Sequence, residues 1–151
     1  MATKNELKKL LDEQLNPARV VVFRPELARV LGSVNAALLL AQCCYWADHK
    51  PDEDDMFLHE RAQWQEELAC SRWELERDRE VLMKLGLIGY GRFGAGARVH
   101  YWVEPTRVQA LCWALNSDRC LTKPEGQPKN LLWLMDEFEK VIESEKVIAT
   151  P

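Results

Sequence analysis

Residues 70–103 read CSRWELERDREVLMKLGLIGYGRFGAGARVHYWV, in which a helix pattern is followed by a hairpin pattern. Ser71 and Glu74 form a capping box, in which the hydroxyl and the carboxylate each bind a backbone N–H left free in the first helical turn. Gly86 provides the left-handed residue that commonly ends a helix. The pattern predicts a helix over residues 71–85, whose apolar residues at helical spacing are Leu75, Leu82 and Leu85.

A hairpin is predicted directly after this helix, over residues 87–103. Two extended runs, the second rich in β-branched and aromatic residues, flank a turn at Gly94–Ala95–Gly96. Arg92 and Arg98 lie on either side of that turn. A capped helix that leads into such a hairpin is the plan of a winged helix-turn-helix, in which the helix enters a DNA groove and the hairpin lies along the backbone.

The sequence resembles the winged-helix domains of phage and plasmid replication-initiation proteins and of small regulators of mobile elements. The resemblance is carried by Ser71-Arg72-x-Glu74, Leu82-x-x-Leu85-Gly86-Leu87-Ile88 and Gly94-x-Gly96-Ala97-Arg98-x-x-Tyr101. Three upstream segments also follow the order found in this family: Phe23-Arg24-Pro25-x-Leu27, residues 36–46 and residues 57–64. The resemblance therefore covers about two thirds of the chain. It implies a mainly α fold with a small antiparallel β-sheet (α+β), namely a winged helix-turn-helix with extra N- and C-terminal amphipathic helices.

Two residues depart from the family pattern. His59 stands where the family usually has a Ser or Thr helix cap, so the start of the next helix is not defined by a cap. Asp78 stands where the family usually has a small residue facing the core. We expect Asp78 to pair with an arginine or to contact a partner.

Composition limits the function classes. The chain has 151 residues, 47% of them hydrophobic and 29% charged, which is typical of a globular protein with one core and excludes disordered and fibrous classes. Its formal net charge of -4 argues against a protein that coats nucleic acid indiscriminately, because that binding depends on Lys and Arg neutralising phosphates. DNA contact would therefore need a local basic surface.

The cysteines and the apolar runs indicate a compartment. Five cysteines without a Cys-x-x-Cys pair favour free thiols in a reducing cytoplasm over a disulfide framework. The longest apolar run, Val34 to Ala47, is interrupted by Gln42 and is too short to span a bilayer. The charged start of the chain lacks a secretory signal. We expect a cytoplasmic protein that does not enter membranes.

The chain is expected to have four parts: an N-terminal amphipathic helix (1–17), a winged-helix domain (18–116), a linker (117–129) and a C-terminal amphipathic helix (130–151). The first helix carries the leucine stripe Leu7, Leu10, Leu11 and Leu15, which must pack on something. The last helix would pack beside the first or form a homodimer. Its inward residues are expected to be Leu131, Leu134, Met135, Phe138, Val141 and Ile142.

The central part begins with residues 19–23, a β-branched run expected to form a strand that pairs with the wing. Pro25 to Leu31 is predicted to be a short helix closed by Gly32. Residues 34–46 follow, a helix so nearly apolar all round that it belongs in the centre of the core.

An acidic loop, residues 48–55, separates that helix from the helix-turn-helix. It lacks the spacing of an EF-hand, so we expect no metal site. Residues 60–69 are predicted to be the first helix of the helix-turn-helix, with Trp64 and Leu68 inward.

The predicted DNA-binding residues lie on the second helix of the helix-turn-helix and on the wing. Side chains at the amino end of such a helix reach base edges, and arginine can bind guanine O6 and N7 together. Lys84 and the wing arginines are suited to neutralising phosphates. Glu74 is more simply explained as a helix cap than as a base contact. The full predicted set is Ser71, Arg72, Trp73, Glu74, Arg77, Lys84, Arg92, Arg98 and His100.

The charges of the helix could instead form a solvated face of ion pairs. Four cations face four acids along it: Arg72, Arg77, Arg79 and Lys84 against Glu74, Glu76, Asp78 and Glu80. Arg92 and Arg98 have no acidic neighbour between residues 85 and 103, and they shift the balance towards DNA binding.

Other patterns have simpler explanations. The letters GYGRFG at 89–94 match a dinucleotide fingerprint, but that site needs a helix where a strand is predicted here, and the glycines more simply serve the twist and turn of the wing. The three histidines lack zinc spacing and a partner acid. Four of the six tryptophans are expected in the core: Trp46, Trp64, Trp113 and Trp133. No nucleophile, base and orienting acid can be assembled, so we expect no catalytic residues, no metal, no cofactor and no enzyme.

The leading hypothesis is a sequence-specific protein that binds double-stranded DNA in replication initiation or transcriptional regulation, with a homodimer or a replication or regulatory protein as further partner. The alternative is a winged-helix protein–protein interaction module, or an acidic adaptor that mimics DNA and does not bind it. In that case the acidic loop and the acidic last helix would bind a basic partner.

Overall fold

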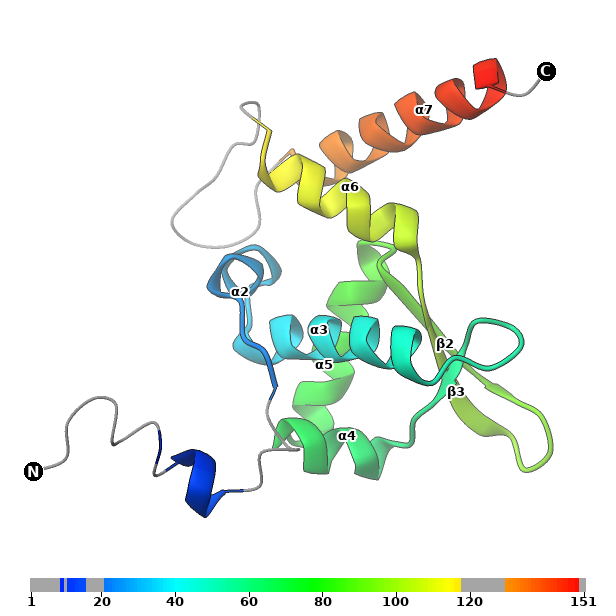
Figure 1. Ribbon diagram of the computed structural model, residues 1–151. Coiled ribbons are helices and arrows are strands. Elements are labelled where there is room, and N and C mark those ends of the chain that lie inside the picture. The colour runs from blue at the N-terminus through cyan, green and yellow to red at the C-terminus, as the bar shows by residue number, and fades with distance from the viewer. Residues whose placement is uncertain (1–8, 10, 16–20, 118–129, 150–151) are drawn as a thin grey trace, which may run out of the picture.

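A computed structural model describes residues 9, 11–15, 21–117 and 130–149. The expected α+β class is confirmed, because most described residues are helical and a three-stranded antiparallel sheet lies on one side (Figure 1). The elements are α2 (Pro25–Leu31), α3 (Val34–His49), β1 (Phe57–Leu58), α4 (Arg61–Leu68), α5 (Arg72–Lys84), β2 (Ile88–Phe93), β3 (Arg98–Val103), α6 (Pro105–Leu115) and α7 (Leu131–Ala149).

The sheet has the order β1-β3-β2. β2 and β3 pair from Ile88↔Val103 to Phe93↔Arg98, and Gly94 and Gly96 both have the positive φ that the predicted turn requires. β1 pairs with the other edge of β3, where Phe57 lies opposite Tyr101.

The prediction of a strand over residues 19–23 is wrong for the residues of this run that the structure describes. Residues 21–23 form no strand, and residues 19 and 20 lie outside the described part. β1 occupies the edge of β3 that such a strand would need, and Val22 remains exposed. A β-branched run favours a strand only together with packing against neighbouring strands, and residues 21–23 pair with none.

The core lies where α3 packs between α2, α5 and the sheet. The rings of Phe57, Trp64 and Tyr101 are almost fully buried and contact one another, with centroids 5.5–6.2 Å apart. α3 is not buried all round, because Val34 and Tyr45 are exposed. Its buried residues are Ala36, Ala37, Leu39, Leu40 and Cys43.

α4 and α5 are joined by a tight turn in which Ala69 has a left-handed φ of 51°. The predicted capping box is confirmed: Ser71 Oγ accepts from the N–H of Glu74, and Glu74 Oε1 accepts from the N–H of Ser71, each at 3.1 Å. Gly86 ends this region with φ 73°. α4 begins after Glu60, whose N–H donates to the Gln63 side chain at 2.7 Å, so His59 does not act as its cap.

α7 packs on α6, at one side of the described part of the chain (Figure 1). Arg107 ties the two helices to the end of α5: it pairs with Asp136 at 2.9 Å and donates two hydrogen bonds to the Leu85 carbonyl. Leu131, Leu134 and Met135 are buried as predicted. Two expectations are wrong: Val141 is 55% exposed and Trp133 is 53% exposed. Trp133 lies in the first turn of α7, on a different face from the buried Leu131, Leu134 and Met135.

The leucine stripe of the first helix is described only in part. Residues 11–14 are helical, and Leu11 and Leu15 are exposed, so the structure does not show the packing that the stripe predicts. Most of the predicted linker lies outside the described residues.

No single helix in the described part of the chain is both long and apolar enough to cross a membrane; only α2 and α3, taken together as a pair bent by 115°, pass that test. Cys43, Cys44, Cys70 and Cys112 are free thiols.

Gly89 and Gly91 make room for aromatic rings on the outer face of the hairpin. A Cβ on Gly89 would lie 2.2 Å from the Trp102 ring, and one on Gly91 would lie 2.7 Å from the Phe93 ring. The glycines of the GYGRFG run therefore serve ring packing, and a strand follows them as predicted.

We expect Gly89→Ala to destabilise the protein by about 1–3 kcal/mol, because the added methyl overlaps the Trp102 ring. The cost should be much smaller in a Trp102→Ala background, where that ring is absent. Urea unfolding of the two single variants and the double variant measures the difference. An equal cost in both backgrounds would contradict this packing.

Candidate nucleic-acid interface

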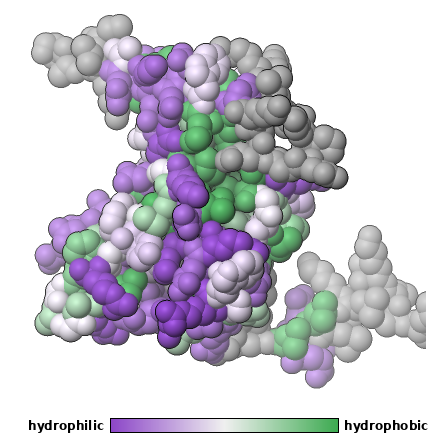
Figure 2. Space-filling view, turned by 180° about the vertical axis from the view of Figure 1, so that it is seen from behind, coloured by the Kyte–Doolittle hydropathy of each residue, from purple (hydrophilic) through white to green (hydrophobic). Residues whose placement is uncertain are grey.

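The outer face of α5 carries an exposed aromatic residue next to cations. Trp73 is 67% exposed, and the Arg77 guanidinium lies 4.9 Å from the centre of its ring. Arg72 is exposed at the first position of the same helix. In Figure 1, α5 lies behind α3. Figure 2 shows the molecule from behind, and the surface of its lower part on that side is mostly hydrophilic. An exposed tryptophan contributes little to the core, so it is available for contact with a partner.

The predicted cations of α5 are exposed, but each has a carboxylate partner. Arg72 pairs with Glu76 at 2.9 Å, Arg77 with Asp78 at 3.1 Å and Lys84 with Glu80 at 3.3 Å. The hydrogen bond from Arg72 lowers the pKa of Glu76, and nearby Arg79 and Arg61 lower it further. The outer face of α5 is therefore a surface of ion pairs, as the equal numbers of cations and acids along this helix also predict.

Glu74 is held as a cap. Its Oε1 accepts from the N–H of Ser71, and its Oε2 accepts from Asn35 of α3 at 2.6 Å. The hydrogen bonds with Ser71 lower the pKa of Glu74, and Arg77 and Asn35 add to the effect. Both carboxylate oxygens are used within the protein, which favours the capping role over a base contact.

The hairpin presents its cations on two different faces. Side chains alternate along a strand, so Arg92 lies on the face of Tyr90 and Tyr101, whereas Arg98 and His100 lie on the face of Trp102. Arg92 and Arg98 therefore lie on different faces of the hairpin, although they stand on either side of one turn.

The wing cations also differ in their partners. Arg98 pairs with Glu60 at 3.4 Å, although no acid is near it in sequence. Arg92 donates to the Ala97 carbonyl at 3.3 Å, and His100 Nδ1 lies 3.0 Å from the Arg98 carbonyl.

Three further residues belong to this region and were not predicted. Glu60 comes beside Arg98 because β1 pairs with β3, a pairing that no local sequence signal indicates. Arg61 is exposed at the first position of α4, and it is close enough to Glu76 to lower that carboxyl's pKa. Arg79 is used internally: it donates to Tyr101 Oη at 3.0 Å and lies 4.0 Å from the Tyr90 ring centre.

Asp78 is 1% exposed and pairs with Arg77, as one of the two expectations for it states. Its second oxygen, Oδ2, has no hydrogen-bond partner within the described residues.

A buried polar cluster lies beneath this region, between α3 and α4. Glu67 accepts hydrogen bonds from Gln42 and, at 2.8 Å, from Trp46 Nε1, and its Oε2 lies 2.8 Å from His59 Nε2. Lys50 Nζ completes the cluster, 3.2 Å from His59 Nδ1. The expectation that no histidine has a partner acid is therefore wrong, because the fold brings Glu67 against His59, which is 2% exposed.

The cluster perturbs two pKa values. Burial alone would raise the pKa of Glu67, but hydrogen bonds from His59, Gln42 and Trp46 outweigh burial and hold it below its ordinary value of 4.5. Burial lowers the pKa of Lys50, and the nearby Glu67 carboxylate opposes this shift. Within the described residues no group of three or more His, Cys, Asp or Glu side chains could hold a metal ion.

Comparisons with known proteins give limited similarity. No protein-family model matches the chain, and no curated protein matches it. One solved structure, described as "Structure of Rep-DNA complex", is similar over 69% of this chain and 82% of that chain, with 16% sequence identity and a TM-score of 0.45. Similarity at this level does not define a function.

This comparison corrects one expectation. The sequence predicts that the chain is not an enzyme, but the similar solved chain is a Rep protein bound to DNA, and similarity to it gives no ground for excluding catalysis.

We expect the Glu67 cluster to make stability depend on acid pH. A folded pKa below 4.5 means that the ionised carboxylate stabilises the fold fully above about pH 4.5, and that this contribution is lost as the pH falls through the folded value. Glu67→Gln should cost about 1–3 kcal/mol at neutral pH and should remove this part of the acid dependence.

Urea unfolding between neutral pH and pH of about 3 measures both effects. Glu143→Gln, which removes an exposed carboxylate of α7, is the matched control and should follow the parent protein. A Glu67→Gln protein whose stability falls in parallel with the parent over the acid range would show that Glu67 does not contribute this dependence.

Proposed function

We propose that the chain is a winged helix-turn-helix protein that binds double-stranded DNA through α5 and the β2–β3 hairpin. In this proposal α4 and α5 are the helix-turn-helix, β2 and β3 are the wing, and residues 18–116 are the binding unit. The order helix, strand, helix, helix, hairpin and the sheet order β1-β3-β2 support it. The process served would be replication initiation or transcriptional regulation.

The observation that carries the proposal is the Trp73–Arg77 pair beside Arg72 at the amino end of α5. This end of a second helix is the part that enters the major groove in helix-turn-helix proteins. Arginine can bind guanine there, and an aromatic ring can contact the thymine methyl group, so the pair supplies chemistry for reading sequence. Arg72, Trp73 and Arg77 are therefore the proposed base-reading residues.

The ion pairs on α5 are compatible with this role. An exposed ion pair contributes only about 0–1 kcal/mol, so Arg72 or Lys84 can exchange a carboxylate for a phosphate at small cost. Arg77 is different, because its partner Asp78 is buried and the loss of that pair would be costly, so Arg77 is proposed to contact DNA while it stays paired with Asp78. Lys84, Arg92, Arg98 and the newly located Arg61 are the proposed phosphate contacts. Ser71 and Glu74 are proposed to hold the end of α5 in position, and His100 adds a polar group to the wing.

A second candidate function is protein binding without DNA. It is favoured by the same ion pairs, because each predicted cation of α5 already has an acidic partner. The free thiols fit a reducing compartment such as the cytoplasm under either function.

We expect Arg92→Ala/Arg98→Ala to weaken binding to duplex DNA of mixed sequence and to flatten its salt dependence. Each lost phosphate contact should change the slope of log K against log salt by about 0.9. Fluorescence anisotropy with a labelled duplex, repeated over a series of salt concentrations, measures both quantities.

The matched control is Arg29→Ala/Lys140→Ala, which removes two exposed cations from α2 and α7, outside the proposed interface. It should leave the slope close to that of the parent. Unchanged affinity and slope in the wing variant would contradict the proposal, and absence of binding at low salt would favour the protein-binding alternative.

A further inference from the structure

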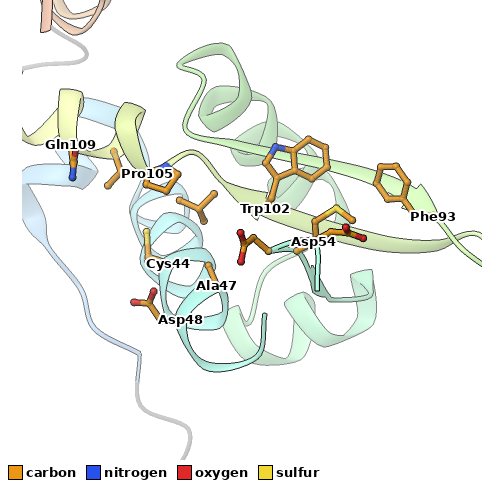
Figure 3. A pocket seen from close by; sticks show the side chains of 12 residues that line it. Cys44, Ala47, Asp48, Asp54, Phe93, Trp102, Pro105 and Gln109 are labelled. Atoms are coloured by element: carbon orange, nitrogen blue, oxygen red, sulfur yellow. The ribbon is translucent and has the colours of Figure 1, made fainter. Parts of the chain in front are cut away.

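A groove of about 800 Å³ lies on the outer face of the hairpin (Figure 3). Its hairpin wall is formed by Phe93 and Trp102, and its opposite wall by Asp54, Asp55 and Met56 of the loop after α3. The end of α3 and the start of α6 close it, through residues such as Asp48 and Val108. We call it the Trp102 groove.

The hairpin wall offers aromatic faces. Each ring lies against a glycine, Trp102 over Gly89 and Phe93 over Gly91, so one face of the ring is covered and the other is turned away from the strand. The two ring centroids are 6.2 Å apart, and Phe93 is 43% exposed. The surface between them is apolar and negatively polarised, as aromatic faces are.

The groove is lined by carboxylates that have no counter-ion within the described residues. Asp48, Asp54 and Asp55 line the groove, and no ion pair to any of them occurs within the described residues. Lys50, the nearest cation in sequence, is used elsewhere: it donates to the Leu58 carbonyl at 3.0 Å and lies 4.5 Å from the Trp46 ring centre.

Asp52 holds this acidic wall in place. Its Oδ1 accepts from the N–H groups of Asp54 and Met56, each at 2.9 Å, and its own N–H donates to the Met56 carbonyl at 2.6 Å. Asp54 and Asp55 are thereby presented by a hydrogen-bonded turn and need little ordering on binding.

We propose that the Trp102 groove docks a segment of a protein partner in which a Lys or Arg stands next to an apolar side chain. The cation would lie between the aromatic faces and the carboxylates, both of which attract positive charge, while the apolar side chain would cover Met56 and Val108. DNA does not fit this groove, because the carboxylates of Asp48, Asp54 and Asp55 line it and would repel phosphates.

The groove is separate from α5, although Arg98 and His100 lie on the same face of the hairpin as Trp102. Trp102 lies on the opposite face of the hairpin from Tyr90 and Tyr101, the residues that Arg79 of α5 contacts. The groove could therefore hold a protein segment while α5 meets DNA.

The test uses three short capped peptides of equal length that share leucine at their apolar positions. The polar positions are all Arg in the first peptide, all Gln in the second and all Glu in the third. Isothermal titration calorimetry at low salt should show binding of the Arg peptide in preference to the other two. Asp54→Asn/Asp55→Asn should weaken it by roughly tenfold, because two of the three carboxylates lose their charge. Asparagine tolerates the left-handed φ of 60° at Asp55, so this variant should fold.

Matched controls remove the same groups elsewhere. Glu143→Gln/Glu145→Gln takes two exposed carboxylates from α7, and it should leave Arg-peptide affinity unchanged. Phe93→Ala should weaken that affinity, whereas Leu132→Ala, an exposed apolar truncation on α7, should not.

Three results would overturn the proposal. Equal affinity for the Gln peptide would indicate an apolar partner without charge recognition, and an equal loss in the α7 control would indicate attraction to net charge alone. Self-association that is lost in Asp54→Asn/Asp55→Asn, without Arg-peptide binding, would assign the groove to a second copy of the chain. Each result is separate from the outcome of the DNA-binding experiment.

Discussion

One side chain of α5, Arg79, links the helix to both strands of the hairpin. Its guanidinium stacks on the Tyr90 ring and donates to Tyr101 Oη, so a residue in the middle of the helix contacts both strands of the hairpin. Tyr101 is itself fixed by the buried rings of Phe57 and Trp64. The exposed side of α5 and the two faces of the hairpin are therefore presented by one connected set of aromatic and cationic contacts.

Local signals predicted the elements on which the proposed site is built. The capping box at Ser71, the apolar spacing along α5, the left-handed Gly86 and the glycine turn of the hairpin each act within a few residues, and the structure has all four. The partner of β3, the end of α7 and the surroundings of His59 could not be predicted in the same way. They depend on which edge is free, on how far α6 reaches along α7, and on which acid the packing of α3 and α4 brings to the histidine.

The same limit applies to the charges. Sequence neighbours suggested that Arg98 has no acidic partner, yet strand pairing places Glu60 beside it. Alternation along the strands separates Arg92 from Arg98, although both lie close to one turn. A protein with a net charge of -4 thus presents exposed cations that are mostly neutralised by neighbours, and its affinity for DNA would depend on exchanging weak ion pairs for phosphate contacts.

Chemical-shift mapping tests this account most directly, because it reports where DNA touches the protein. A ¹⁵N-labelled sample is titrated at low salt with duplex DNA of mixed sequence. The account predicts that perturbed amides cluster at the start of α5 and at the tip of the hairpin, while α7 and the loop over residues 51–56 remain unperturbed. Perturbations confined to other surfaces, or none at all, would contradict it.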